Sequence, residues 1–372
     1  MKKDLHFIVQ LNTGSFDRCA VTYEEAEERL SAVISRLPIS EVIFGWSQDR
    51  ALNEALCALL SDKDVDAYFW LPVFSEMRRP EAAEPFVPFG EVGERAIRLC
   101  RDEAFEFACP SAQTNLDAAL ETFKSVCGGL PLKGVFLDRI RYPSAANFSA
   151  AIYGCSCPNC RKVYAAHGAA DIAPGHISSA HFLPSAVDGT RLRFDDEAAA
   201  HLFQARNAII SRTVGDLSRA FHDLGLKVGL DSFAPLLAEY VGQDLDFIAA
   251  NVDFVKPMLY QRTYAPAGVP FEAEAIDRFI ASGDPDAAFH GLKERTSDDR
   301  LYEMIAGLQS RFGNICPGIE INRIAPICDT DMDYILSSIE KSRAAGCERI
   351  VLSWDILRAE PSVIDRLAAA VQ

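Results

Sequence analysis

The sequence predicts a closed (β/α)8 barrel, and three observations lead to that fold class. Eight short apolar segments of strand length alternate with longer segments of helical periodicity, which is the order of a parallel sheet. The chain has 372 residues, a usual size for such a barrel with insertions. The competing α/β fold, an open doubly wound sheet, favours a glycine-rich phosphate-binding loop after an early strand, and neither common form of that loop occurs in the chain.

The expected strands and helices alternate along the whole chain. Strands are predicted at 5–11, 41–47, 67–74, 134–141, 227–233, 254–261, 316–322 and 349–357. Helices are predicted at about 22–37, 49–61, 91–102, 115–127, 195–224, 273–282, 297–311 and 330–345. The clearest helix start is Thr22-Tyr-Glu-Glu25, where a capping threonine is followed three residues later by a glutamate, and Pro38 ends the same helix.

The spacing of these segments predicts a single barrel domain over residues 1–372 with two long insertions. The first follows the third strand and includes an expected extra strand at 105–109. The second, residues 143–195, follows the fourth strand and carries a cluster of cysteines and a loop rich in proline, serine and histidine. Long loops after barrel strands lie at the end where active sites form, so we expect this second insertion to cover the barrel mouth.

Net charge and hydropathy argue against two classes of partner. The formal net charge is −16, whereas nucleic acids and anionic membranes both attract basic surfaces. A carbohydrate or a related small molecule is compatible with this charge. No segment is apolar enough to span a bilayer, and no signal-peptide core follows Met1-Lys-Lys3, so we expect a cytoplasmic protein. The sequence carries no signal for an oligomeric state.

The fourth expected strand ends in an unusual group of charged residues. In Gly134-Val-Phe-Leu-Asp-Arg-Ile-Arg-Tyr-Pro143, an apolar run gives way to Asp138, Arg139, Arg141 and Tyr142. A carboxylate at the end of a dry strand costs several kcal/mol unless it is paired or takes part in chemistry. Active sites of parallel barrels form at the C-terminal ends of the strands, so this segment predicts an enzyme-like site.

Other strands place polar and aromatic residues at the same end. Aromatic rings stack on the C–H faces of sugars, and acids and amides bind sugar hydroxyls, so this set predicts a carbohydrate site. The residues expected to contact substrate are Trp46, Arg139, Arg141, Tyr142, Asp231, Tyr260, Gln261, Trp354 and Asp355. Further residues at strand ends are Gln10, Asn12, Trp70, Glu76, Lys256 and Met258. No histidine cluster of metal-binding type accompanies them, so no cofactor is expected for catalysis.

Asp138 and Glu320 are the predicted catalytic pair. Glycoside hydrolysis uses two carboxyl groups that flank the scissile bond, and the fourth and seventh strands face each other across an eight-stranded barrel. The arginines beside Asp138 favour an ionised nucleophile or base, whereas the apolar Pro317-Gly-Ile319 before Glu320 favours a proton donor. Asp231 and Asp355 are the reserve carboxyl groups. A separation of about 5–5.5 Å predicts retention of configuration, and about 6.5–9.5 Å predicts inversion.

Each of these residues also has a purely structural interpretation. The acids then serve only as structural partners: Asp138 in a salt bridge with Arg139 or Arg141, Glu320 in an outward pair with Arg323, and Asp355 in a pair with Arg358. Asp231 has the alternative of capping a turn. For Trp46, Trp70 and Trp354 the alternative is packing in the core. The hypothesis of a carbohydrate site therefore depends on the convergence of these residues at one end of the barrel.

Three segments resemble a known family. Gly134–Pro143 resembles the signature G-[IV]-x-L-D-x-[IV]-R-[YF]-P of glycoside-hydrolase-like TIM-barrel proteins, and Val252–Tyr260 resembles their segment D-[YF]-[VI]-x-P-M-x-Y. Pro317–Glu320 is similar to their seventh strand. The resemblance covers roughly residues 40–360 and implies a (β/α)8 barrel with a carbohydrate-active site that contains Asp138 and Tyr260. The chain departs from well-known retaining barrels because it has no Asn-Glu pair at the fourth strand.

Cys155, Cys157 and Cys160 form a C-x-C-x2-C cluster with the compactness of a metal knuckle. A closed zinc site needs a fourth ligand, for which Cys109 and His167 are the nearest candidates, with His176 and His181 further along. The alternatives are unligated loop thiols or a disulfide in an exported protein. If a metal binds, a structural zinc is expected, because three thiolates leave little Lewis acidity for catalysis.

Three functions follow from the sequence. The leading hypothesis is a glycoside hydrolase that acts on O-glycosyl bonds with paired carboxyl groups. The second is a glycan-binding barrel without catalysis, whose acids only bind hydroxyls. The third is a lyase or aldolase on a small polar substrate with Lys256 as the Schiff-base former, although Lys256 is better placed to pair with an acid at a strand end.

Overall fold

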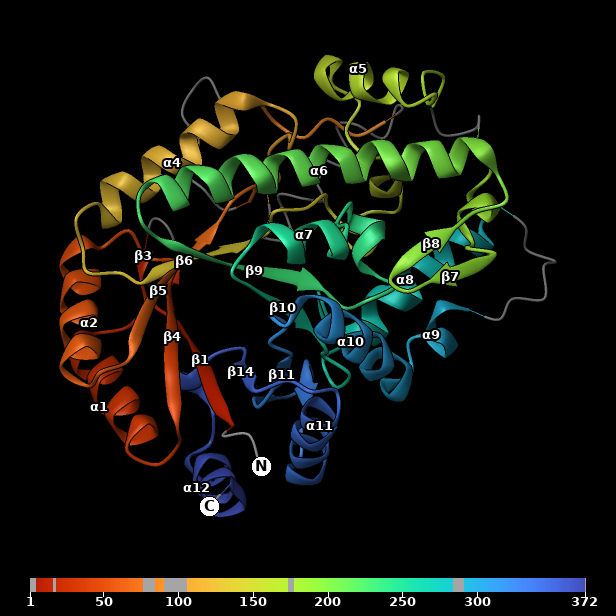
Figure 1. Ribbon diagram of the computed structural model, residues 1–372. Helices are drawn as coiled ribbons and strands as arrows, with labels where there is room; N and C mark the ends of the chain where they lie inside the picture. The colour runs from red at the N-terminus through yellow and green to blue at the C-terminus, as the bar shows by residue number, and fades with distance from the viewer. Residues whose placement is uncertain are drawn as a thin grey trace.

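Eight parallel strands close into a barrel, and helices surround it (Figure 1). The computed structural model describes residues 5–15, 18–75, 84–89, 106–172, 177–283 and 291–371. The barrel strands, in chain order and in the order of their pairing, are β1 (His6–Asn12), β4 (Ile39–Gly45), β5 (Asp66–Pro72), β6 (Gly134–Asp138), β9 (Lys227–Phe233), β10 (Phe254–Met258), β11 (Gly318–Glu320) and β14 (Arg349–Ser353). The predicted fold class is confirmed.

The helices connect successive strands on the outside of the barrel. They are α1 (Tyr23–Ile34), α2 (Arg50–Asp62), α4 (Gln113–Cys127), α5 (Pro158–Ala166), α6 (Glu197–Asp223), α7 (Leu245–Asn251), α8 (Val269–Ala281), α9 (Leu292–Arg295), α10 (Asp298–Phe312), α11 (Met332–Ala344) and α12 (Pro361–Val371). Single 3-10 turns lie at Ser149–Tyr153, Ser179–Phe182, Ala238–Val241 and Ile356–Arg358. No described helix is both long and apolar enough to cross a membrane.

In the described part of the chain, three short antiparallel hairpins lie outside the barrel sheet. They pair β2 (Gly14–Ser15) with β3 (Arg18–Cys19), β7 (Ala186–Asp188) with β8 (Arg191–Arg193), and β12 (Arg323–Ile324) with β13 (Cys328–Asp329). The extra strand expected at 105–109 is reduced to isolated bridges at Phe107 and Ala108 in its described part. The expected helix at 91–102 lies outside the described residues, as do Glu76 and His176.

Local sequence explains where several elements begin and end. Thr22 caps α1 with a complete capping box, since its side chain accepts from the Glu25 backbone and the Glu25 carboxylate accepts from the Thr22 N–H. β6 ends earlier than predicted, at Asp138, because Arg139 has a left-handed backbone with φ of +54° and leaves the ladder. The residues after Asp138 therefore turn across the barrel end.

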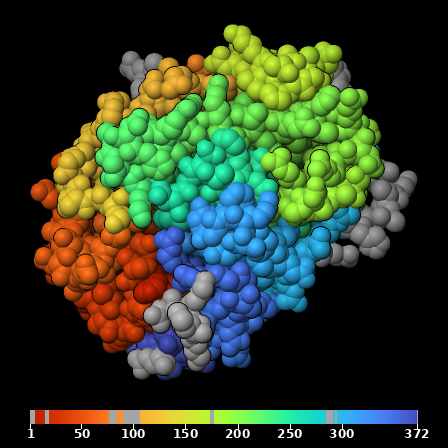
Figure 2. All heavy atoms as spheres, in the orientation of Figure 1, coloured from red at the N-terminus to blue at the C-terminus, as the bar shows by residue number. Residues whose placement is uncertain are grey.

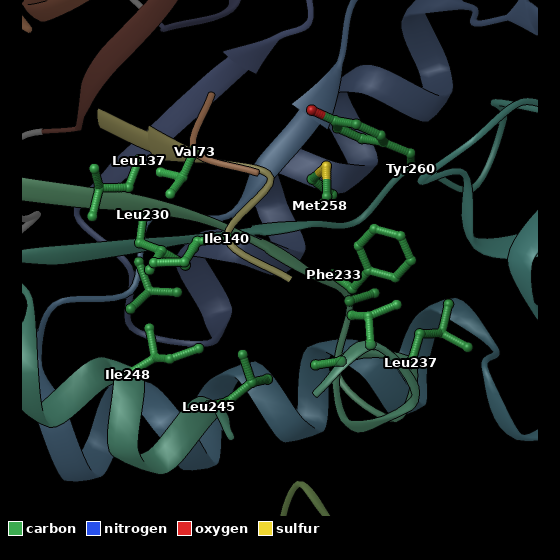
Figure 3. Packing of buried hydrophobic residues seen from close by; sticks show 14 of the residues in the cluster. Val73, Leu137, Ile140, Leu230, Phe233, Leu237, Leu245, Ile248, Met258 and Tyr260 are labelled. Atoms are coloured by element: carbon green, nitrogen blue, oxygen red, sulfur yellow. The ribbon is translucent and has the colours of Figure 1, made fainter. Parts of the chain in front are cut away.

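Two separate apolar layers hold the barrel together. Inside it, Ile8, Ile43, Tyr68, Trp70, Phe136, Phe254, Cys316 and Val351 pack into one cluster. Outside it, the alternate strand residues pack against the helices. Figure 3 shows Leu245 and Ile248 of α7 directed at Ile140 and Leu230 of the β6 and β9 region. This inner cluster fills the interior of the barrel. An open site can therefore form only beyond the cluster, at the C-terminal ends of the strands.

The described part of the segment 143–195 packs against α6 and α8. Its helix α5 lies along the outer side of α6 (Figures 1 and 2). The expectations that it covers the mouth, and that residues 1–372 are one domain, remain predictions.

Candidate active site

The C-terminal ends of the strands surround a cavity of about 360 Å³, here called the mouth cavity. Its volume lies in the range of small-molecule binding sites. The lining residues are Gln10, Asn12, Trp46, Trp70, Asp138, Arg139, Arg141, Asp231, Lys256, Met258, Tyr260, Thr263, Ala265, Pro266, Ala267, Ile327, Trp354, Asp355 and Arg358. All three tryptophans of the chain are among them. The described lining includes no residue of the segment 143–195.

The strand period explains why polar side chains from several strands line this cavity. Ile8, Phe136 and Phe254 belong to the inner apolar layer. The next inward-facing residue on each strand comes two positions later, and these residues are Gln10, Asp138 and Lys256. The same change from apolar to polar on several strands places a ring of polar groups on an apolar floor.

Asp138 is held in position by two N–H donors. Trp70 Nε1 donates to Oδ2 at 3.0 Å, and the Arg139 backbone N–H donates to Oδ1 at 2.6 Å. The side chain is 9% exposed and lines the mouth cavity. The carboxylate is therefore both oriented and accessible, as a group that contacts substrate must be.

Asp231 lies beside Asp138 on the neighbouring strand. The β6–β9 register pairs Leu137 with Leu230, so Asp138 and Asp231 are the next two residues along it. Lys256 Nζ donates to Asp231 Oδ2 at 3.0 Å and to the Tyr260 hydroxyl at 2.7 Å. Burial raises the pKa of Asp231 to about 7, against the opposing effect of the Lys256 ammonium. Asp231 is thus a carboxyl group that holds a proton near neutral pH, and it does not cap a turn.

Four residues of the cavity wall contain buried polar atoms that lack a hydrogen-bond partner among the described residues. The atoms are Gln10 Nε2, Trp46 Nε1, Asp231 Oδ1 and Trp354 Nε1. Buried polar groups are normally hydrogen-bonded. Their concentration around one cavity favours a site that a polar ligand completes.

Two of the three arginines in the wall, Arg139 and Arg141, stack on aromatic rings. The Arg139 guanidinium lies 4.3 Å from the ring centre of Trp46. The Arg141 guanidinium lies between Phe107 and Phe233, at 5.2 and 4.6 Å from their ring centres. Burial lowers the pKa of Arg141 to about 10, so it remains charged at neutral pH. Each stacked guanidinium is fixed in position beside the carboxyl groups.

Glu320, the other half of the predicted pair, lies under a loop. It is completely buried, and it accepts hydrogen bonds from the Arg262 backbone N–H and from Thr263 Oγ1, the latter at 3.2 Å. Burial raises its pKa to about 8. Glu320 is not among the residues that line the mouth cavity, so the structure does not bring it together with Asp138 there. It also does not form the alternative outward pair, because Arg323 binds Asp329.

The remaining predicted residues divide between the cavity and its surroundings. Tyr260, Trp46, Trp354 and Asp355 line it. Asp355 accepts from the Asn12 backbone at 3.2 Å and lies 3.7 Å from Arg358, the pairing considered from the sequence. The other two are placed elsewhere: Gln261 donates to the Thr296 carbonyl, and Tyr142 is completely buried beside Cys160.

Part of the cavity wall had no signal in the sequence. Thr263, Ala265, Pro266 and Ala267 come from the loop after β10, and Ile327 comes from the β12–β13 hairpin. These small or apolar residues carry no chemistry of their own. The only cue is the turn-forming Ala-Pro-Ala-Gly sequence at 265–268, which predicts a loop without indicating where the loop folds.

A wider groove lies between α1 and α12 and shares Asn12, Trp46, Asp355 and Arg358 with the mouth cavity. Its volume is about 850 Å³. Its remaining described wall is helix and loop surface and does not include Asp138 or Asp231. We therefore place the candidate active site in the smaller mouth cavity, where the two carboxyl groups meet.

Four buried cysteines gather outside the mouth cavity. The Sγ atoms of Cys109, Cys155, Cys157 and Cys160 all lie within 4.8 Å of one another, so the cluster could hold a metal ion. Cys109 thus takes the fourth position that the sequence left open. His167 contacts the Val163 carbonyl and His181 pairs with Asp196, so neither histidine belongs to the cluster.

Comparison with solved structures finds glycoside hydrolase barrels. The PgaB (BpsB) glycoside hydrolase domain from Bordetella bronchiseptica is similar over 99% of both chains, with a TM-score of 0.64 and 12% identity. Alpha-L-fucosidase isoenzyme 2 from Paenibacillus thiaminolyticus is similar over 99% of this chain and 49% of that one, with a TM-score of 0.55 and 11% identity. At these identities the likeness shows a shared fold. No protein-family model matches the chain, and neither does any curated protein.

Proposed function

We propose that the mouth cavity is the active site of a glycoside hydrolase acting on O-glycosyl bonds. The observation that carries this proposal is that two carboxyl groups on adjacent strands, Asp138 and Asp231, line one cavity together with every tryptophan of the chain. Paired carboxyl groups and aromatic platforms are what glycoside hydrolysis requires. The shared fold with a glycoside hydrolase domain agrees with this proposal.

Two residues compete for the role of the second carboxyl group. Glu320 was expected from the sequence, but both of its oxygens accept hydrogen bonds from the loop after β10. Asp231 lines the same cavity as Asp138 and has an oxygen without a partner. The geometry therefore favours Asp231, one of the two reserve carboxyl groups.

The two aspartates divide the chemistry between them. Asp231, whose pKa is raised to about 7, donates its proton to the glycosidic oxygen as that bond breaks. Asp138, oriented by Trp70 and by the Arg139 backbone, attacks the anomeric carbon. Water then attacks the glycosyl–enzyme bond, and Asp231 accepts its proton. Neighbouring strands lie about 4.8 Å apart, close to the separation of retaining enzymes, so we expect retention of configuration.

The proposed hydrolysis needs no cofactor, because the two carboxyl groups supply the acid and the nucleophile. The zinc that we expect at the four-cysteine cluster is structural, since four thiolates leave no open position for substrate. The cytoplasm remains the expected compartment of the protein.

A screen of aryl glycosides and oligosaccharides tests the proposal. Wild type should release reducing ends from at least one substrate, and Asp138→Asn should lower kcat/KM by at least about 100-fold with an unchanged Tm. Asp188→Asn, at an exposed position of the β7–β8 hairpin, is the matched control and should keep full activity.

The other two functions give different results in the same screen. A glycan-binding barrel would bind an oligosaccharide by calorimetry and release no reducing ends. A Schiff-base enzyme would be trapped by borohydride on a carbonyl substrate, but Lys256 Nζ already donates to Asp231 and Tyr260, which favours the hydrolase. A large fall in the Tm of Asp138→Asn, with turnover retained by the folded fraction, would assign that residue a structural role.

A further inference from the structure

The four-cysteine cluster joins two loops that are far apart in the sequence. Cys109 lies in the segment that leads into α4, and the other three belong to the segment around the start of α5. Cys109 Sγ lies 3.3 Å from Cys157 Sγ and 3.6 Å from Cys160 Sγ. A disulfide bond would be about 2.05 Å long. Four sulfurs at about 2.3 Å from a tetrahedral zinc lie about 3.8 Å apart, which is close to the separations found.

Backbone N–H groups already point at these sulfurs. The Val87 N–H donates to Cys155 Sγ at 3.3 Å, and the Cys160 N–H donates to Cys157 Sγ at 3.4 Å. Such donors stabilise negative charge on a sulfur and orient it toward a metal. One donor belongs to the segment 84–89 and the other to α5, so the backbone of both segments contacts the cluster.

A buried cation beside the cluster is an independent observation. Arg206 of α6 is completely buried, and its Nε and Nη1 have no hydrogen-bond partner among the described residues. Its guanidinium lies 5.0 Å from the ring centre of Tyr142, whose hydroxyl lies 3.9 Å from Cys160 Sγ. Its Nη2 donates to the Tyr240 carbonyl at 2.6 Å, but its charge has no ion-pair partner among the described residues, and a buried charge without such a partner is costly. Zinc bound by four thiolates has a net charge of −2, which would offset the positive charge of Arg206.

The cluster also reaches the wall of the mouth cavity. Phe107, two residues before Cys109, stacks on Arg141, which lines the cavity. Tyr142, beside Cys160, follows Arg141 directly and lies four residues after Asp138. The loop that contains Cys109 therefore packs on one face of Arg141, and Arg141 itself belongs to the loop that leads to the other three cysteines.

We infer that the four cysteines bind one zinc ion whose tetrathiolate charge is partly offset by Arg206, and that this centre clamps the loops after β5 and β6 against the wall of the mouth cavity. This inference uses the cavity only as a structural feature, so it does not depend on the reaction proposed above.

Metal analysis tests the zinc centre itself. The full chain, purified without added metal and dialysed, should contain one zinc per chain by mass spectrometry. Cys109→Ser should hold less than a tenth of that amount. Cys347→Ser, at another buried free cysteine, and His167→Ala should match wild type. A metal-free wild type, zinc retained by Cys109→Ser, or a disulfide within the cluster would overturn the inference.

Arg206→Met tests the charge compensation without touching a ligand. We expect a chelator to remove zinc from this variant about tenfold faster than from wild type, the lower end of the effect of residues around a metal site. An unchanged release rate would contradict a compensating role for Arg206. Should that variant fold poorly, Arg206→Lys gives a second comparison, because it keeps the positive charge and should release zinc at nearly the wild-type rate. Release from Arg206→Lys about tenfold faster than from wild type would contradict a role for the charge.

Tryptophan fluorescence tests the clamp, because all three tryptophans line the mouth cavity. Stripping zinc from wild type should increase iodide quenching of the emission at least twofold, and added zinc should reverse the change. Phe107→Leu, which keeps every thiol but removes the ring stacked on Arg141, should keep its zinc and show the same increase. Unchanged quenching in both samples would refute the clamp and leave the zinc centre to the metal analysis.

Discussion

At the scale of single residues, burial and the Lys256 ammonium act in opposite directions on the pKa of Asp231. The ammonium lies 3.0 Å from Asp231 Oδ2 and opposes the effect of burial, which raises the pKa of that carboxyl group to about 7. A proton donor works only while it is protonated, so kcat/KM should fall as the pH rises through about 7.

Replacing Lys256 shows whether this pairing controls the reaction. In Lys256→Met the opposing charge is gone, so the pKa of Asp231 rises and the alkaline limb of kcat/KM should move upward by about one pH unit or more. Lys341→Met, which removes a surface lysine bound to Asp298 and Asp299, is the control and should leave the profile unchanged. An unmoved limb in Lys256→Met would show that Asp231 is not the proton donor.

The two candidates for the second carboxyl group can be separated by substitution. Asp231→Asn should lower kcat at least about 100-fold, whereas Glu320→Gln should lower it less than tenfold. The folded pKa of Glu320 is about 8, above the ordinary 4.5, so its contribution to stability is complete below pH 4.5 and is lost as the pH rises through 8. The Tm of wild type should therefore fall as the pH rises from 4.5 to 8, and this fall should be smaller in Glu320→Gln. A loss of turnover in Glu320→Gln equal to that in Asp231→Asn would restore the pair expected from the sequence.

At the scale of elements, the end of β4 positions two tryptophans. A Cβ added at Gly45 would lie 2.5 Å from the Trp70 carbonyl oxygen and 2.9 Å from Trp70 Cβ, and the Gly45 φ of +156° disfavours other residues. The close approach brings Trp46 against Trp70, with ring centres 5.4 Å apart, and Trp70 donates to Asp138. The glycine thus supports the orientation of the proposed nucleophile from the neighbouring strands.

Gly45→Ala should therefore reduce turnover at least tenfold and lower the Tm, because the added methyl group displaces Trp70 from Asp138. Gly307→Ala is the matched control. Gly307 lies in α10, nothing is within 4 Å of its added Cβ, and alanine should stabilise that helix by about 0.5–1 kcal/mol. Thermal melts and kinetics of the two variants test this, and equal activity in both would show that the β4 end does not position the site.

At the scale of the whole molecule, periodicity made the fold predictable. The eight barrel strands were expected within a few residues of their observed positions, because buried parallel strands are continuous apolar runs. Some predicted strands extended too far at their C-terminal ends, as at 134–141. Apolar residues such as Ile140 follow Asp138, the last residue of β6, and made the strand look longer. The short helix α7 was missed because seven residues carry too little periodicity.

The candidate site was predictable only in part. Residues fixed by the alternation along a strand, such as Asp138, Asp231 and Trp46, were expected at the barrel end and do line the cavity. Glu320 and Tyr142 were expected there as well, but loops decide their surroundings: the loop after β10 covers Glu320, and the cysteine-bearing loops enclose Tyr142. No pattern in one sequence shows how such loops fold over strand ends.

The most direct measurement is a crystal structure of Asp138→Asn with an oligosaccharide that the screen identifies as a substrate. We predict a sugar ring in the mouth cavity beside Trp46 and Trp354, with its glycosidic oxygen within hydrogen-bond distance of Asp231 Oδ1. A ligand bound only in the groove between α1 and α12, or one whose glycosidic oxygen lies beside Glu320, would contradict the account.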